Sequence, residues 1–246
     1  MSIDLKENER IDDLEFKGLK IIQNKQGFCF GIDSVLLTDF AKEIKPNSKV
    51  IDLGSGTGII PILLSAKTVN TDFVGIEIQK SVAEMASRSV EINKLQDRII
   101  IRNRNILDLN IDYEKGSFDV VTTNPPYKKK NTGLMNDNSQ KLISRHEITA
   151  SLEDFIKLSS YLLKDYGEFY MVHRPDRLVD ILYLMRKHNI EPKKIRFIYP
   201  NKKKNTNLLL IKGVKCGKPF LRFEDNLYIY NEDGNYTEEI LRIYNK

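Results

Sequence analysis

A glycine-rich turn directly after a short apolar run is the feature that most restricts the fold of this chain. The run Lys49–Leu53 is rich in β-branched residues, which is typical of a buried strand. The turn Gly54-Ser55-Gly56-Thr57-Gly58 follows it, and Ile59–Ala66 then has the composition of a helix, with Pro61 tolerated in the first turn. A strand, a tight turn and a helix in this order predict one unit of a layered α/β sheet.

The rest of the chain continues this alternation of short apolar strands and amphipathic helices. We expect further strands at 72–78, 98–102, 118–122, 168–172, 193–199 and 207–211. We expect further helices at 81–93 and 176–188, and one that begins at Ser151 and is stopped by Gly167. Strands separated by helices predict a Rossmann-like, doubly wound, mostly parallel sheet of seven strands with helices on both faces. The 246 residues fit a single domain, 1–246, with an N-terminal extension of about 48 residues before the first core strand.

The two ends of the chain are less regular. The first dozen residues predict a loose, charged arm, and Leu14–Phe30 a short hairpin or isolated strands. Asp33 is the expected N-cap of a helix that continues through Phe40. The tail from Phe220 onward predicts a hairpin and a short terminal helix.

Composition excludes several classes of protein. Hydrophobic residues make up 41% of the chain, enough for a core, but apolar runs such as Leu208–Ile211 are far shorter than the ~20 residues of a membrane span. The polar N-terminus has no signal-peptide core, which predicts a cytoplasmic protein. Cys29, Cys216 and three scattered histidines match no metal pattern, so we expect reduced thiols and no metal. The net charge of +5 permits nucleic-acid binding without requiring it.

The glycine turn narrows the choice of ligand. A dinucleotide fingerprint needs its third glycine at position 59, which is Ile59, and no Lys-Ser or Lys-Thr pair is present for a phosphate loop. Glu77 ends the next strand, where a carboxylate can accept from both hydroxyls of a ribose. The alternative is a solvent-exposed glutamate at a strand end. We therefore expect a nucleoside ligand other than a dinucleotide or ATP.

The segment Asn124-Pro125-Pro126-Tyr127 is the most specific motif in the chain. Two prolines fix the backbone and leave the Asn124 side-chain oxygen and the Pro125 carbonyl as fixed acceptors at the end of a strand. Two acceptors suit the two protons of a planar amine, and Tyr127 offers a flat ring for stacking. The motif predicts transfer of a group to an exocyclic amine by positioning and fixed dipoles, without a catalytic base. A plain proline-rich turn is the alternative.

With both motifs present, the sequence resembles the class I S-adenosylmethionine-dependent methyltransferases. DLGSGTG matches their cofactor loop and Glu77 their ribose-binding acid. Asn105 falls where the class usually has an aspartate near the adenine, with Asp108 as a nearby substitute. The resemblance thus implies an enzyme with S-adenosylmethionine as cofactor, and cofactor contacts at Asp52, Gly54, Ser55, Gly56, Gly58, Glu77, Ile78 and Asn105.

Two lysine runs bear on the substrate. Lys128, Lys129 and Lys130 directly follow the Asn-Pro-Pro-Tyr motif, and Lys202, Lys203 and Lys204 lie between the last two expected strands. In this fold both runs should reach the cofactor end of the sheet, which favours a nucleic-acid substrate over two solvated loops. A base in an RNA loop reaches a stacking tyrosine more easily than a base in a duplex.

The whole pattern resembles one family, the bacterial valine-tRNA adenine-N6 methyltransferases. The matching segments are FCFGIDSVLLTDFA, VIDLGSGTGIIPILL, TTNPPYKK, SRHEITASLEDF and FYMVHRPDRLVDI. The resemblance implies N6-methylation of the adenosine just 3′ of the anticodon, with Asn124, Pro125, Pro126 and Tyr127 as the target-amine site and tRNA as partner.

Several points stay open at this stage. Arg174 either contacts RNA or makes a structural ion pair, and the roles of Asp33, His146 and Arg177 are not assigned. The alternative functions are guanine-N2 methylation of rRNA, glutamine-amide methylation of a protein, and nucleotide binding without catalysis. The oligomeric state is open, and a monomer is compatible with the sequence.

Overall fold

The structure, a computed structural model, describes residues 5–27, 31–127 and 150–246. The strands are β1 (Glu9–Asp13), β2 (Lys20–Asn24), β3 (Lys49–Leu53), β4 (Asp72–Glu77), β5 (Ile99–Asn103), β6 (Phe118–Thr123), β7 (Leu163–His173), β8 (Ile190–Tyr199), β9 (Leu208–Lys215), β10 (Arg222–Phe223) and β11 (Leu227–Tyr228). The helices are α1 (Ile32–Phe40), α2 (Ile59–Lys67), α3 (Lys80–Ile92), α4 (Leu109–Asp112), α6 (Leu152–Leu162), α7 (Leu178–Lys187) and α8 (Glu238–Ile243).

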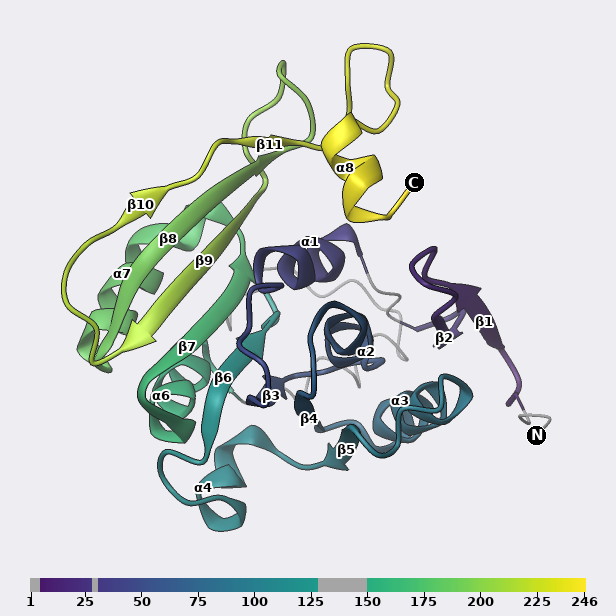
Figure 1. The fold of residues 1–246 in the computed structure, drawn as a ribbon, viewed down its shortest axis with the longest axis horizontal. Coiled ribbons are helices and arrows are strands. Elements are labelled where there is room, and N and C mark those ends of the chain that lie inside the picture. Colours follow the sequence, from purple (N-terminus) through teal and green to yellow (C-terminus); the bar gives the residue numbers. More distant parts are fainter. Residues whose placement is uncertain (1–4, 28–30, 128–149) are drawn as a thin grey trace, which may run out of the picture.

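A nine-stranded sheet forms the centre of the part that the structure describes (Figure 1), in the order β10-β8-β9-β7-β6-β3-β4-β5, with β11 also pairing with β8. It contains the seven expected strands and two additional strands of two residues each. Neighbours from β7 to β5 pair in parallel, and only β9 runs antiparallel to its neighbours β7 and β8. The prediction of a doubly wound, mostly parallel sheet is confirmed.

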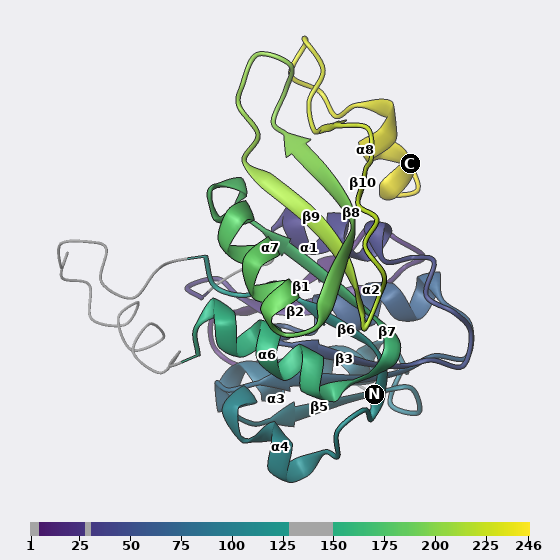
Figure 2. The same ribbon diagram turned by 90° about the vertical axis from the view of Figure 1, so that its left-hand side faces the viewer.

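Helices cover both faces of this sheet, as Figures 1 and 2 show. Alternate strand residues enter different apolar clusters: Val50 packs in the cluster that includes α1 and α2, whereas Ile51 packs in the cluster that includes α6 and α7. This alternation follows from the two-residue period of a strand buried on both sides. Every helix within the described ranges is too short or too polar to cross a lipid bilayer.

Three local expectations were wrong. Glu9–Asp13 is not a loose arm but pairs antiparallel with Lys20–Asn24, and this hairpin packs on α3, where Ser89 Oγ accepts from the Ile22 amide at 2.9 Å. Gly31, not Asp33, is the N-cap of α1. Gly167 does not end the helix before β7, because α6 ends at Leu162 and strand pairing resumes at once. In each case the observed structure depends on contacts with distant parts of the chain, which a local sequence pattern does not show.

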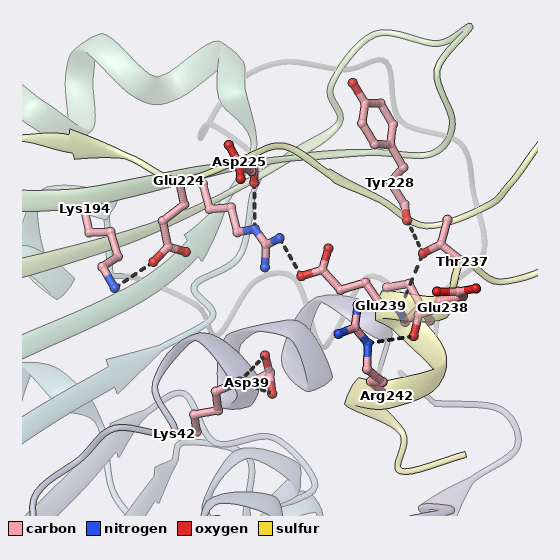
Figure 3. Close-up of polar contacts among 12 residues, drawn as sticks. Asp39, Lys42, Lys194, Glu224, Asp225, Tyr228, Thr237, Glu238, Glu239 and Arg242 are labelled. Atoms are coloured by element: carbon pink, nitrogen blue, oxygen red, sulfur yellow. Dashed lines mark hydrogen bonds and ion pairs between the residues drawn. The ribbon is translucent and has the colours of Figure 1, made fainter.

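The C-terminal tail extends the sheet instead of forming an independent hairpin. β10 and β11 pair in parallel with β8, and only an isolated Tyr230–Tyr236 bridge is hairpin-like. The expected terminal helix is present as α8. Arg196 of β8 anchors this tail, because its guanidinium donates to the Asp225 carbonyl at 2.9 Å and to Glu239 at 2.6 Å. Figure 3 labels both of these acceptor residues, Asp225 and Glu239.

Candidate cofactor and substrate site

The predicted site residues gather at one edge of the sheet. Gly54 follows β3, Glu77 ends β4, Asn105 comes two residues after β5, and Asn124 follows β6. These strands are parallel neighbours, so their carboxyl ends meet at the same edge, where open α/β sheets bind their ligands. Leu53 pairs with Thr123, which brings the start of the glycine turn next to Asn124.

The glycine turn adopts a conformation that requires glycine. Gly54, Gly56 and Gly58 have φ values of +76°, +54° and +82°, in the left-handed region that side chains other than glycine rarely adopt. A Cβ placed on Gly56 would have no neighbour within 4 Å, so this turn borders open space. The turn is fixed from below, because the amides of Gly54 and Ser55 both donate to the Ile76 carbonyl, at 3.0 and 2.8 Å.

Asp52 is buried beneath this turn and joins two strands. Its carboxylate accepts from Ser55 Oγ at 2.5 Å and from Thr122 Oγ1 of β6 at 2.7 Å. Burial raises the pKa of Asp52 to about 6, although both hydroxyl donors oppose this shift. Both oxygens of the Asp52 carboxylate are bonded inside the protein and the residue is only 1% exposed, so Asp52 supports the shape of the turn from within.

Glu77 lies beside the turn with its carboxylate already oriented. One oxygen accepts from the Gly56 amide at 3.0 Å and the other from the Gln79 amide at 2.9 Å. Burial raises the pKa of the Glu77 carboxyl, and the backbone donors oppose part of that shift. Because each carboxylate oxygen can accept more than one hydrogen bond, both retain capacity for a ribose hydroxyl.

Asn105 and Ile78 border the same edge on the β5 side. The Asn105 side-chain oxygen accepts from the Leu107 amide at 3.1 Å and so caps the turn Ile106–Asp108, while the residue stays half-buried. Ile78 is half-buried, and its carbonyl accepts from Asn103 at 2.7 Å. The Asn105 amide group is thus held in place at the edge of the sheet.

Asn124 is held by α1, a contact that the sequence analysis did not predict. Its Nδ2 donates to Asp33 Oδ2 at 3.1 Å and to Ser34 Oγ at 3.2 Å. The Tyr127 hydroxyl lies 2.7 Å from both Asp33 Oδ2 and Asn124 Oδ1. Burial, followed by the negative charge of Asp33, raises the pKa of Tyr127, so its hydroxyl stays protonated.

His173, at the end of β7, packs against the ring of Tyr127. The two rings meet edge to face with their centroids 5.2 Å apart. Burial lowers the pKa of His173 to about 4, and its Nδ1 accepts from the Arg174 amide at 2.8 Å. His173 is therefore a neutral, fixed wall beside the Tyr127 ring. The sequence did not predict the contact between His173 and Tyr127, because the only indication of it was that His173 lies at the end of a strand.

The basic residues fall into two groups. Lys202, Lys203 and Lys204 are exposed in the loop after β8, which runs in the same direction as β7, so this loop lies at the edge that carries Asn124. Arg174 makes an exposed ion pair with Asp176 at 3.3 Å. Lys128, Lys129, Lys130 and His146 lie outside the described residues. Of the two cysteines, Cys216 is free and exposed, and Cys29 lies outside the described part.

Comparison with known proteins identifies the family. A family model described as the methyltransferase small domain matches residues 31–182, more than half of the 246 residues. The chain belongs to this family. The tRNA1(Val) (adenine(37)-N6)-methyltransferase of Porphyromonas gingivalis is 29% identical to this methyltransferase over 239 residues, 94% of this chain and 93% of the relative. The protein of the same name from Mannheimia succiniciproducens is 26% identical over 235 residues, covering 93% and 90%.

Solved structures agree with this assignment at the level of the fold. A predicted O-methyltransferase from Agrobacterium tumefaciens matches this methyltransferase with a TM-score of 0.70 at 19% identity, over 87% of this chain and 95% of the other. Geranyl diphosphate C-methyltransferase from Streptomyces coelicolor A3(2), crystallised with S-adenosyl-L-homocysteine, matches with a TM-score of 0.55 at 15% identity, over 74% and 78%. The methyltransferase fold expected from the sequence is confirmed.

The site of this methyltransferase fits a nucleoside cofactor. The left-handed glycines leave space beside Gly56, and Glu77 presents carboxylate oxygens that are already oriented. No group of three or more histidine, cysteine or acidic side chains within the described ranges is arranged to hold a metal ion. The arrangement can therefore hold a nucleoside next to the amide oxygen of Asn124 and the buried Pro125.

Proposed function

We propose that this methyltransferase transfers the methyl group of S-adenosylmethionine to N6 of an adenosine in tRNA, namely the one just 3′ of the anticodon of a valine tRNA. The observation that carries the proposal is the Asn124 amide, held by Asp33 and Ser34 beside the glycine turn. Relatives named for adenine-37 N6-methylation of tRNA1(Val), aligned over more than nine-tenths of this chain, support the choice of base and RNA. This substrate implies a cytoplasmic location.

The cofactor would be held by the turn and by Glu77. Gly54, Gly56 and Gly58 would follow its methionine and ribose parts, Glu77 would accept from the ribose hydroxyls, and Asn105 would face the adenine. Ser55 and Ile78 would line the same site, and Asp52 would support it from beneath. When bound, S-adenosylmethionine supplies an electrophilic methyl group on a sulfonium.

The Asn-Pro-Pro-Tyr segment would prepare the target amine. Asn124 Oδ1 and the Pro125 carbonyl accept its two protons, which draws the nitrogen towards a tetrahedral shape and directs its lone pair at the methyl carbon. Pro126 rigidifies the segment, and Tyr127 stacks on the base. The target nitrogen would accept the methyl group that the bound sulfonium supplies, leaving a neutral thioether, and water would then take one proton from the methylated amine. Positioning and fixed dipoles provide the catalysis.

The basic residues would bind the RNA backbone. Lys202, Lys203 and Lys204 lie at the edge that carries the site, and we extend the proposal to Lys128, Lys129, Lys130 and Arg174. For single-stranded RNA, each lysine that neutralises a phosphate steepens the slope of log binding constant against log salt concentration by about 0.7. Replacing Lys202–Lys204 by alanine should raise the KM for tRNA and flatten its dependence on salt, with kcat little changed. An unchanged salt slope would remove this loop from the RNA-binding surface.

A methyl-transfer assay tests the function directly. The purified protein is incubated with methyl-labelled S-adenosylmethionine and, in separate reactions, a valine tRNA transcript, the same transcript with guanosine in place of adenosine 37, rRNA, or a protein extract. Label as N6-methyladenosine in the first transcript alone supports the proposal. N2-methylguanosine in rRNA, or label in protein, would replace the substrate while keeping the amine chemistry.

Asn124→Ala tests the role of the motif. The variant should lose transfer while its cofactor affinity stays within a few fold, because the glycine turn and Glu77 are unchanged. Asn110→Ala, at an exposed position of α4, is the matched control and should keep full activity. An Asn124→Ala variant that remains fully active would refute the mechanism, and wild-type cofactor binding without any transfer would favour a binding module.

A further inference from the structure

We propose that Asp33 is a positioning residue that selects one orientation of the Asn124 amide and keeps its oxygen available for the target amine. This inference rests on the proposed function, since it concerns how Asn124 meets the amine. Asp33 is separated from Asn124 by 91 positions in the sequence, and α1 brings the two together at the carboxyl end of β6.

The hydrogen bonds of the Asn124 amide fix its orientation. Both protons of Nδ2 have acceptors on α1, the Asp33 carboxylate at 3.1 Å and the Ser34 hydroxyl at 3.2 Å. A flipped amide would place its oxygen against a carboxylate and lose the stronger of these bonds. Asp33 is itself anchored, because its other oxygen accepts from the Ser34 amide at 2.9 Å. Oδ1 of Asn124 is therefore the end that faces away from α1.

The charge of Asp33 also makes Asn124 a better acceptor. A carboxylate forms stronger hydrogen bonds than a neutral oxygen, and hydrogen bonds in a chain polarise one another. An amide that donates to a carboxylate at Nδ2 carries more negative charge on its oxygen. The target amine donates to this oxygen, so Asp33 strengthens the contact that prepares the amine for transfer.

Tyr127 competes for the same oxygen. Its hydroxyl has one proton and lies 2.7 Å from both Asn124 Oδ1 and Asp33 Oδ2. The charged oxygen is the stronger acceptor, so Asp33 draws this proton away from Asn124. Without that charge, the proton would pass to Oδ1 and occupy the acceptor that the target amine needs. Asp33 thus orients Asn124 and removes its competitor.

Asp33→Asn tests this role, because it keeps the size of the side chain and removes its charge. We expect kcat to fall about 10- to 100-fold, in line with the loss of a charge-assisted hydrogen bond, while the KM for tRNA and the cofactor affinity change less than about 3-fold. Asp39→Asn is the matched control on the same helix. It breaks ion pairs with Lys42 and Lys67 and should lower Tm without lowering kcat.

A second variant separates positioning from a structural effect. In the Asp33→Asn background, adding Tyr127→Phe removes the competing hydroxyl and should raise kcat at least about 3-fold, whereas the same change in the wild-type background gives no such gain. A merely structural role of Asp33 predicts no rescue. If Asp33→Asn does not fold, Ser34→Ala removes the other acceptor and should lower kcat by a smaller factor.

A spectroscopic readout keeps this inference separate from the substrate. The side-chain amide signals of Asn124 in a ¹H–¹⁵N spectrum of the free protein should shift in Asp33→Asn and not in Asp39→Asn. Unchanged signals, or an unchanged kcat, would overturn the role of Asp33. Failure of the wild type to methylate any RNA would instead overturn the proposed function, and the amide signals would still report the contact between Asp33 and Asn124.

Discussion

Replacing Asp52 by asparagine should stabilise the protein, by an amount that depends on pH. Asp52 is 1% exposed, and burial raises its pKa from 3.8 to about 6. A shift of about two units corresponds to about 3 kcal/mol between the two protonation states. An asparagine keeps the shape and carries no charge, and the hydroxyls of Ser55 and Thr122 can rotate to suit its amide.

The sign of the effect follows from proton linkage. Between pH 3.8 and about 6 the folded protein retains a proton on Asp52 that the unfolded chain has released. Stability from this group is fully present below the unfolded pKa and is lost as the pH rises through the folded pKa. The Asp52→Asn variant does not lose stability in this way. From pH 3.8 to about 6, the difference in unfolding free energy between the variant and the wild type should grow by about 3 kcal/mol in favour of the variant, with about two-thirds of this growth above about pH 4.5.

Urea unfolding of both proteins between about pH 4.5 and 8 measures this difference. Asp119→Asn is a control of opposite sign: burial alone would raise the pKa of Asp119, but hydrogen bonds from Lys164 and the Lys49 amide lower it. That variant should be less stable than the wild type by an amount that stays nearly constant over this range, because the lowered pKa keeps Asp119 ionised throughout it. A difference between Asp52→Asn and wild type that stays constant with pH would refute the assignment of a raised pKa to Asp52.

Three further changes test the turn, the ribose contact and the tail. Gly58→Ala places a side chain at φ +82° and 3.3 Å from the Ala86 Cβ, so urea unfolding should show a loss of about 1–2 kcal/mol, and no loss would contradict the left-handed turn. Glu77→Gln should weaken S-adenosyl-L-homocysteine binding about 10-fold or more by calorimetry, and unchanged affinity would argue against ribose binding. Arg196→Ala should cost about 1–3 kcal/mol, and more than Lys194→Ala, because the Lys194 side chain is 31% exposed and that of Arg196 only 14%; equal costs would show that Arg196 does not anchor the tail.

The regular core was readable from the sequence because its signals are local. Apolar runs such as Lys49–Leu53 end at glycines or prolines, and the predicted starts and ends of most core elements lie within three residues of those observed. The two ends of the chain were not readable in this way. β1 depends on pairing with Lys20–Asn24, and β10 depends on pairing with β8, so neither pattern of residues identifies its partner. Two-residue strands such as β10 contain too few positions for any periodicity.

In the candidate site, too, the features that depend on local sequence were predictable and those that depend on distant contacts were not. Backbone features, such as the left-handed glycines and the strand-end position of Glu77, follow from residue type and order. The orientation of side chains does not. The motif predicts a flat Tyr127 ring for stacking, but it does not predict that this ring meets His173 edge to face or that its hydroxyl contacts Asp33. These two contacts hold the Tyr127 ring, so its position depends on residues outside the Asn-Pro-Pro-Tyr motif.

Asp33 shows why such residues are misread from sequence alone. An aspartate near the start of a predicted helix is usually assigned as its cap, because the carboxylate satisfies free backbone amides. Here Gly31 occupies the cap position, and the Asp33 carboxylate accepts from Asn124 and Tyr127 in addition to the Ser34 amide. The difference arises because α1 begins at the carboxyl edge of the sheet, where its first turn meets the end of β6. At that edge, acidic residues in the first turn of a helix have polar partners from neighbouring strands, and they belong among the candidates for positioning catalytic groups.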